Sequence, residues 1–232
     1  MAFKLILFDI DGTLLLSGGA GGRAMKRAGQ TLFGDTFQFN VDTAGMLDPH
    51  IYAELCAANP RLEMAGEHDT FRETYLTILE TMLTQTPGLA YSLPGVEELL
   101  RHLQTRVQLG LLTGNYGPAA QLKLRHAGLS ADAFGVTAFG DEAPTRPALV
   151  PLALSRYEEL YGESLRSEEV IVIGDTPKDI DCALQNGSYA FGVATGKYSA
   201  AELREAGAQR VVENLREGGG VPELLGIGEG SS

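Results

Sequence analysis

The feature that most constrains the fold of this chain is an alternation of short apolar runs with helix-like segments. Successive apolar residues are typical of a strand buried on both faces, and such strands alternating with helices form βαβ units around a parallel sheet. The expected strands cover residues 4–10, 107–112, 135–139, 170–173, 189–193 and 209–212. The expected helices between them cover residues 96–104, 118–127, 147–161, 178–185 and 200–206.

Residues 18–91 interrupt this alternation and show mainly helical patterns, at 23–32, 49–58 and 67–83. An ordinary connection between a strand and a helix is much shorter, so this segment indicates an insertion. We therefore predict an α/β fold: a Rossmann-like parallel sheet sandwiched by helices, with an inserted α-helical cap domain. The core would comprise residues 1–17 and 92–232, and the cap residues 18–91. The Gly- and Pro-marked segments 17–22 and 86–95 would be its hinges.

Composition narrows the possible partners and the compartment. The 232 residues carry a formal net charge of −12, which argues against nucleic acid or an anionic membrane as the main partner. Cys56 and Cys182 lie far apart, which favours free thiols in a reducing compartment. No apolar run approaches the length of a membrane span, and we see no signal-peptide pattern. The expectation is a cytoplasmic protein, monomeric or homodimeric.

The segment "DIDGTL" at residues 9–14 is the strongest functional signal. An Asp-Gly turn would explain Asp11 and Gly12, but not the carboxylate of Asp9 at the end of an apolar run. If the strand continued through both acids, Asp9 and Asp11 would share one face, about 5 Å apart, and would repel by roughly 3 kcal/mol at an effective dielectric constant of about 20. Such a pair requires a cation or a shared proton.

These residue types are suited to phosphoryl transfer. Asp9 can act as a carboxylate nucleophile that forms an acyl phosphate. Asp11 is close enough to give a proton to a leaving oxygen and later to take one from water. Gly12 allows the backbone to approach a phosphate and offers its amide.

A second acidic cluster follows the apolar run at 170–173. Asp175 comes just after the predicted strand, and Asp179 lies at the start of the next helix, where helix capping is an alternative role. Because the carboxyl ends of parallel strands share one edge of a sheet, Asp175 should meet Asp9 there. The resulting site of oxygen ligands suits Mg²⁺, which would also neutralise an incoming phosphate.

The segment "LLTGN" at 111–115 ends a third predicted strand. The hydroxyl of Thr113 and the amides of Gly114 and Asn115 can cradle phosphate oxygens near the start of a helix. The sequence Thr-Gly-Asn is also common in ordinary loops, so this segment indicates a phosphate site only in combination with the two acidic segments.

Together, in this order, the three motifs resemble those of the haloacid dehalogenase superfamily, over about residues 3–213 and with the cap after the first motif. The resemblance implies that Asp9 is the nucleophile and Asp11 the general acid and base. It also implies that Mg²⁺ is held by Asp9, the Asp11 carbonyl and Asp175, that Thr113 binds the phosphoryl group, and that Asp179 supports the metal site and orients a basic residue.

The chain departs from the family's pattern at the basic residue of its third motif, which is usually the lysine of a Lys-Pro pair at the start of a helix. Arg146-Pro147 stands here instead, and Arg can hold a phosphate bidentately. Lys178 is the alternative cation.

The resemblance is nearest to phosphoglycolate phosphatases, so we expect a Mg²⁺-dependent phosphatase acting on a small phosphorylated metabolite through an aspartyl-phosphate. Asp11 argues against dehalogenases and phosphonatases. A phosphomutase of the β-phosphoglucomutase type, or a catalytically silent phosphate-binding regulatory protein, remains open. In the cap, Arg23 could reach a second anionic group of the substrate and Asp48 could touch the leaving group, although a solvated helix face and a helix cap are equally ordinary roles.

Overall fold

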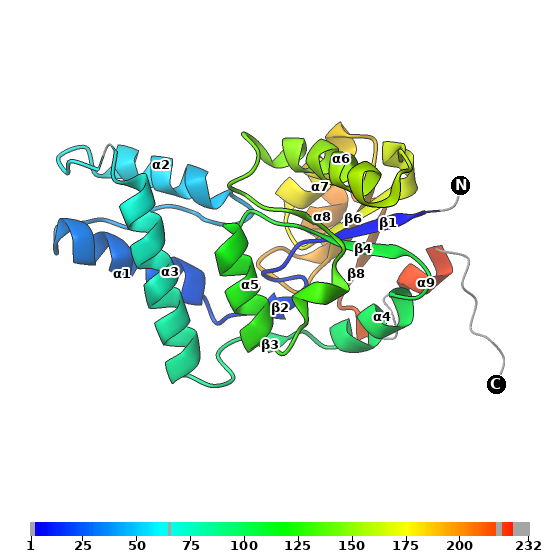
Figure 1. Cartoon of the computed structure of the whole chain (residues 1–232), viewed down its shortest axis with the longest axis horizontal. Helices are drawn as coiled ribbons and strands as arrows, with labels where there is room; N and C mark the ends of the chain where they lie inside the picture. The colour runs from blue at the N-terminus through cyan, green and yellow to red at the C-terminus, as the bar shows by residue number, and fades with distance from the viewer. Residues whose placement is uncertain (1–2, 65, 217–219, 225–232) are drawn as a thin grey trace.

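The structure is a computed structural model that describes residues 3–64, 66–216 and 220–224. A six-stranded parallel sheet lies at its centre (Figure 1). Its strands, in spatial order, are β5 (Val136–Ala138), β4 (Gln108–Leu112), β1 (Leu5–Phe8), β6 (Val170–Gly174), β7 (Tyr189–Val193) and β8 (Arg210–Val212). Because β1 lies between β4 and β6, the segments that follow these three strands leave the sheet at the same edge. The predicted α/β fold is confirmed.

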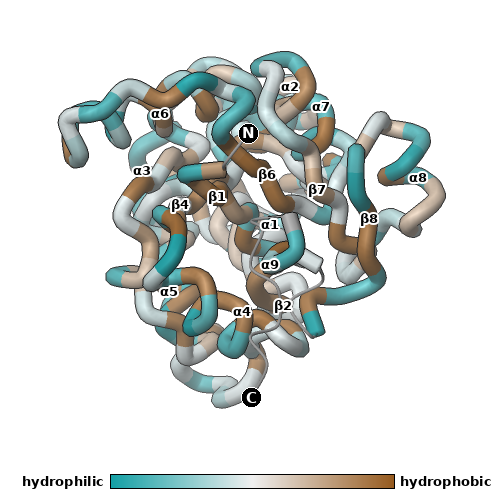
Figure 2. Tube along the Cα trace, turned by 90° about the vertical axis from the view of Figure 1, so that its right-hand side faces the viewer, coloured by the Kyte–Doolittle hydropathy of each residue, from teal (hydrophilic) through white to brown (hydrophobic). Residues whose placement is uncertain are grey.

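Helices cover both faces of the sheet. In Figure 1, α6 and α7 lie above it and α4 and α9 below it. The side chains of β1 explain why its run is apolar throughout: Ile6 and Phe8 belong to one buried cluster, and Leu5 and Leu7 to the other. Figure 2 shows this hydrophobic character along the central strands. The helices are α4 (Val96–Leu103), α5 (Gly117–His126), α6 (Leu149–Tyr161), α7 (Pro177–Gln185), α8 (Ala200–Glu205) and α9 (Val221–Leu224), with short 3₁₀ turns at 131–133, 146–148 and 167–169.

The inserted segment forms a separate group of three helices at the left of Figure 1: α1 (Ala20–Phe33), α2 (Asp48–Ala58) and α3 (His68–Gln85). We call this group the cap. Its apolar cluster includes Phe71 and Tyr75 and continues onto Tyr116 and Ala119 at the start of α5.

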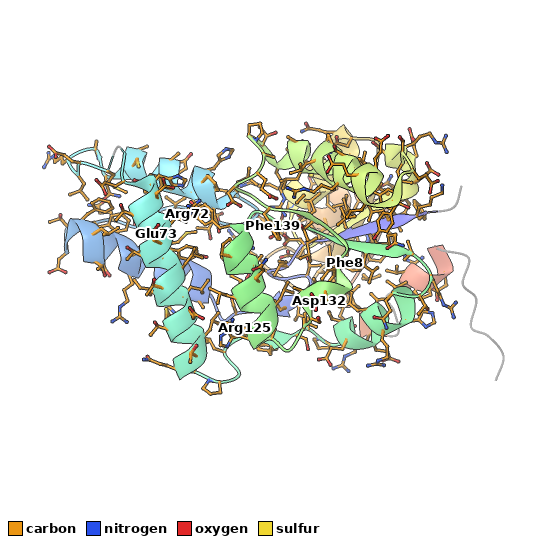
Figure 3. The ribbon with its side chains drawn as sticks, viewed as in Figure 1. Phe8, Arg72, Glu73, Arg125, Asp132 and Phe139 are labelled. Atoms are coloured by element: carbon orange, nitrogen blue, oxygen red, sulfur yellow. The ribbon has the colours of Figure 1, made fainter. Side chains whose placement is uncertain are left out.

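The two connections between cap and core run side by side, because β2 (Leu15–Leu16) pairs antiparallel with β3 (Tyr91–Ser92). This short pairing, which the sequence analysis did not predict, lies beside the expected boundaries at residues 18 and 91. On the side of the cap that faces the core, Arg125 of α5 (labelled in Figure 3) pairs with Glu80 of α3 at 2.9 Å. The cap thus contacts the core through α5 as well as through its connections. Within the described ranges, none of the helices combines the length and apolar character that a membrane crossing requires.

The first strand is shorter than predicted, since it ends at Phe8 rather than Ile10. A turn follows in which the amides of Leu14 and Leu15 donate to the Ile10 carbonyl at 2.9 and 3.1 Å. Gly12 takes a φ of 85° in this turn, a conformation that favours glycine. Asp9 and Asp11 therefore follow the strand rather than sharing one of its faces, and the expected same-face geometry was wrong.

Candidate active site

The motif residues line one cavity of about 510 Å³ between the sheet edge and the cap. Asp9, Thr113 and Asp175 follow β1, β4 and β6, which are neighbours in the sheet. The topology thus brings together three residues that are far apart in the sequence. The lining also includes Asp11, Gly12, Gly114, Asn115, Arg146 and Asp48.

Three buried carboxylates form an acidic cluster, of which Asp9 and Asp175 line the cavity and Asp179 lies behind them. One oxygen from each of Asp9, Asp175 and Asp179 lies within 4.8 Å of the others. Burial raises the pKa of Asp9 to about 7, with repulsion from Asp179 adding to it and Arg146 opposing it. Burial also raises the pKa of Asp175 to about 9, reinforced by Asp9 and Asp179. A divalent cation would relieve this repulsion, and oxygen donors are the ligands Mg²⁺ prefers, so the residues fit the ion.

The members of the cluster differ in how many of their oxygens already accept hydrogen bonds. Asp179 Oδ1 accepts from Arg146, and its Oδ2 accepts from the amide and hydroxyl of Thr176 at 3.0 and 2.7 Å. Asp175 Oδ1 accepts one long hydrogen bond, from Thr13 Oγ1 at 3.4 Å, and its Oδ2 is closely enclosed by backbone, since a Cβ at Gly12 or Gly196 would lie 2.3 or 1.7 Å from it. Asp179 therefore acts chiefly as a structural acceptor, and Asp9 and Asp175 offer the freer oxygens to an ion.

The Asp11 carboxylate turns away from this cluster. Its Oδ2 accepts from Lys123 Nζ and, at 2.9 Å, from Asn115 Nδ2, while Ser17 Oγ lies 3.3 Å from Oδ1. Burial alone would raise the pKa of Asp11, but Lys123 outweighs it, with Asn115 and Ser17, so that the pKa is lowered. The side chain of Asp11 is thus not part of the acidic cluster, whose third acid is Asp179.

The phosphate-binding candidates of the "LLTGN" segment, Thr113, Gly114 and Asn115, line the cavity. Thr113 is fully buried, and its Oγ1 accepts from Asn115 Nδ2 at 2.8 Å. Gly114 lies beneath the cap, where its carbonyl accepts from the Asp48 amide at 2.7 Å. A Cβ at Gly114 would lie 2.0 Å from the Met46 carbonyl, so a side chain there would displace the cap segment. Glycine is required here for the close approach of two backbones.

The structure brings Arg146, and not Lys178, to the acidic cluster. Arg146 is buried, and its Nη2 contacts Asp179 and donates to Asp9 Oδ1 at 3.0 Å. Its Nη1 donates to the Gly45 carbonyl of the cap at 3.2 Å. Although burial opposes its charge, the two carboxylates raise the pKa of Arg146 above its ordinary value. The exposed Lys178 does not line the cavity.

The two cap candidates differ in position. Asp48 is buried at the cavity wall, and its Oδ2 accepts from the Tyr116 amide at 2.8 Å. Burial raises its pKa to about 7, with Lys123 opposing the shift. Arg23 is exposed, does not line the cavity and donates to the Gly18 carbonyl. The structure therefore places Asp48 at the site and leaves Arg23 outside it.

Sequence reasoning missed several residues of the cavity, among them Lys123 and Tyr75. A signal for Lys123 was present, because it falls in the buried stripe of α5 formed by Ala119, Ala120 and Leu124. A lysine in such a stripe needs a buried anionic partner, and the partner here is Asp11. Tyr75 lies in the equally ordinary apolar stripe of α3, and no sequence pattern distinguishes its hydroxyl.

Comparison with known protein families agrees with a hydrolase that has this fold and acidic site. The family model of the haloacid dehalogenase-like hydrolases matches residues 3–187, so the chain belongs to that family of enzymes. No curated protein matches the chain.

Solved structures share the fold. A hydrolase from Pseudomonas syringae is 23% identical, with a TM-score of 0.69 over 91% of this chain and 94% of that one. A β-phosphoglucomutase from Clostridium difficile is 19% identical, with a TM-score of 0.72 over 94% and 93%. A predicted phosphoglycolate phosphatase from Haemophilus somnus is 18% identical, with a TM-score of 0.70 over 93% and 96%.

Proposed function

We propose that this chain is a Mg²⁺-dependent phosphatase that hydrolyses a small phosphorylated metabolite through an aspartyl-phosphate on Asp9. The observation that carries the proposal is the buried cluster of Asp9, Asp175 and Asp179, in contact with Arg146 and beside Thr113. Such a set of groups combines a nucleophile, a cation site and a site for a transferring phosphoryl group.

In the first step, Asp9 attacks phosphorus, the new acyl-phosphate bond forms, and the ester bond to the leaving oxygen breaks. A bound Mg²⁺, held by Asp9, Asp175 and the Asp11 carbonyl, would supply positive charge for the phosphoryl oxygens. Arg146 keeps the Asp9 carboxylate in place and adds charge on the same side. The hydroxyl of Thr113 and the backbone amides of Gly114 and Asn115, which line the cavity, would donate to the phosphoryl group, whereas the Gly12 amide already donates to the Leu15 carbonyl at 2.9 Å.

Asp11 carries the proton in both steps. It gives a proton to the leaving oxygen as the ester bond breaks. It then takes one from the water that attacks the acyl phosphate, which releases inorganic phosphate and regenerates Asp9. Lys123 favours the ionised form of Asp11 and so prepares it for the second step.

The test is a phosphate-release assay on p-nitrophenyl phosphate and a panel of phosphorylated metabolites, with Mg²⁺ and with chelator. Release should require Mg²⁺, and Asp9→Asn should abolish it while the circular dichroism spectrum stays unchanged. Asp181→Asn, an exposed acid of α7, is the matched control and should keep activity. Mass spectrometry after a rapid acid quench should find one phosphoryl group on the peptide containing Asp9. Turnover that survives Asp9→Asn would refute the assignment.

A further inference from the structure

The cap residues that line the cavity differ in chemistry from the core residues that line it. Three glycines, Gly19, Gly21 and Gly22, line it near the start of α1, together with apolar residues such as Met25 and Ile51. Among the described cap residues that line the cavity, the one charged group is the buried carboxyl group of Asp48. The described cap residues of this wall are therefore mostly small or apolar, and none of them carries a positive charge.

Tyr75 adds an unsatisfied hydroxyl group to this wall. The side chain is fully buried in α3, and its Oη has no hydrogen-bond partner among the residues that the structure describes. A Cβ at Gly21 would lie 3.7 Å from this oxygen and 3.3 Å from Lys123 Nζ. The absence of a side chain at Gly21 thus leaves room at a point that both groups can reach. A buried hydroxyl without a partner is costly, so a ligand group that supplies one would be favoured.

The described cations of the cavity all come from the core, and each already contacts a carboxylate. Lys123 contacts Asp11, and Arg146 contacts Asp9 and Asp179. Lys197 lies at the exposed rim, 2.7 Å from Asp42. A leaving group with its own carboxylate or second phosphate would therefore stand beside Asp48 without an uncommitted cation. Like charges brought together in a desolvated site cost several kcal/mol.

We propose that the leaving group is uncharged and carries hydroxyl groups, as in a polyol or sugar phosphate, and that Tyr75 Oη hydrogen-bonds one of them. A hydroxyl group can donate to Asp48 and also donate to, or accept from, Tyr75, so it satisfies both without adding charge. The inference rests on the proposed phosphatase activity and narrows its substrate class. It disfavours phosphoglycolate-type and bisphosphate substrates.

The test compares kcat/KM for esters of matched size. Glycerol 3-phosphate and ribose 5-phosphate represent the uncharged class, and 3-phosphoglycerate and 2-phosphoglycolate carry a carboxylate. The wild-type protein should prefer the better uncharged ester by at least about tenfold. In Tyr75→Phe, the ratio of kcat/KM for that ester to kcat/KM for p-nitrophenyl phosphate should fall by about 3- to 10-fold, the value of one neutral hydrogen bond.

Tyr161→Phe is the control, because this exposed tyrosine of α6 lies outside the cavity, and its ratio should equal that of the wild type. A preference for the carboxylate esters, or an unchanged ratio in Tyr75→Phe, would overturn the inference while leaving the phosphatase assignment intact. If wild-type protein with Mg²⁺ releases phosphate from none of the esters, including p-nitrophenyl phosphate, the proposed function fails and this inference fails with it.

Discussion

Replacing Lys123 with methionine removes the cation that faces Asp11 while keeping most of the side-chain volume. Lys123 is 4% exposed, and its Nζ contacts Asp11 Oδ2 and lies 2.5 Å from Asn115 Oδ1. Methionine fills the same buried stripe of α5 but donates to neither group. The variant therefore separates the charge of Lys123 from its packing.

The magnitude follows from the burial of the two partners. Two unit charges about 4 Å apart interact by about 4 kcal/mol at an effective dielectric constant of about 20. The Asp11 side chain is 39% exposed, however, so solvent screens part of this energy. We expect the pKa of Asp11 to rise, because the cation that lowers it is gone, and the free energy of unfolding to fall by about 1 to 3 kcal/mol.

The assay is the pH dependence of kcat. Hydrolysis of the aspartyl-phosphate needs ionised Asp11, so the acidic limb of the kcat profile should move to higher pH. At neutral pH, kcat should fall much less than in Asp11→Asn, since the carboxylate remains and is still largely ionised.

The control is Arg125→Met, which removes a cation from the exposed side of the same helix, where it pairs with Glu80. Its kcat profile should match that of the wild type. An acidic limb that stays in place in Lys123→Met would refute the role we assign to this lysine, even if the protein loses stability.

Three further predictions test the site and its contact with the cap. Gly114→Ala should lower kcat/KM by at least about tenfold, because its Cβ would meet the Met46 carbonyl of the cap. If the melting temperature falls by less than about 5 °C in the same variant, the loss of activity comes from displacement of the cap and not from unfolding. Asp48 has a raised pKa in the folded state, so its contribution to stability is present below about pH 4 and is lost as the pH rises to about 7. Urea midpoints should therefore decline less between these pH values in Asp48→Asn than in the wild type, and parallel declines would contradict the shift. Mg²⁺ at 100 times its dissociation constant should stabilise the wild type by about 2.7 kcal/mol in thermal denaturation, and Asp175→Asn should lose most of this gain.

The sequence predicted the fold well because the core strands are buried on both faces. Runs such as "VIVI" at 170–173 have no other stable location, and the sheet contains them with shifts of one or two residues at their ends. The pair of β2 and β3 escaped prediction because each strand has two residues and its pairing depends on where the cap connections meet. The expected position of Asp11 was wrong because the strand ends at Phe8 and Asp11 lies in the turn that follows, which closes on the Ile10 carbonyl and includes the positive φ of Gly12.

The sequence predicted which residues form the site better than it predicted which of them contact one another. The motif residues could be identified by type and spacing, but the partner of each depends on distances across the sheet edge. Asp179 was expected to orient the basic residue, and its carboxylate does contact Arg146. Lys123 was not identified, because a single lysine in a helix is ordinarily a surface residue. Its place in the apolar stripe of α5 could have indicated its burial, but its partner, Asp11, becomes apparent only when α5 packs against the turn that carries this residue.

The two carboxylates of "DIDGTL" can stand side by side because each contacts its own cation. Arg146 approaches Asp9 from the side of β6 and α7, and Lys123 approaches Asp11 from α5. Since the two acids face different partners, Asp9 and Asp11 can hold different protonation states at one pH. Their separate environments raise the pKa of the former and lower that of the latter. In this order Asp9 is the harder of the two to ionise, so the proposed attack by its carboxylate needs positive charge beside it, which Arg146 supplies in part and a bound Mg²⁺ would complete.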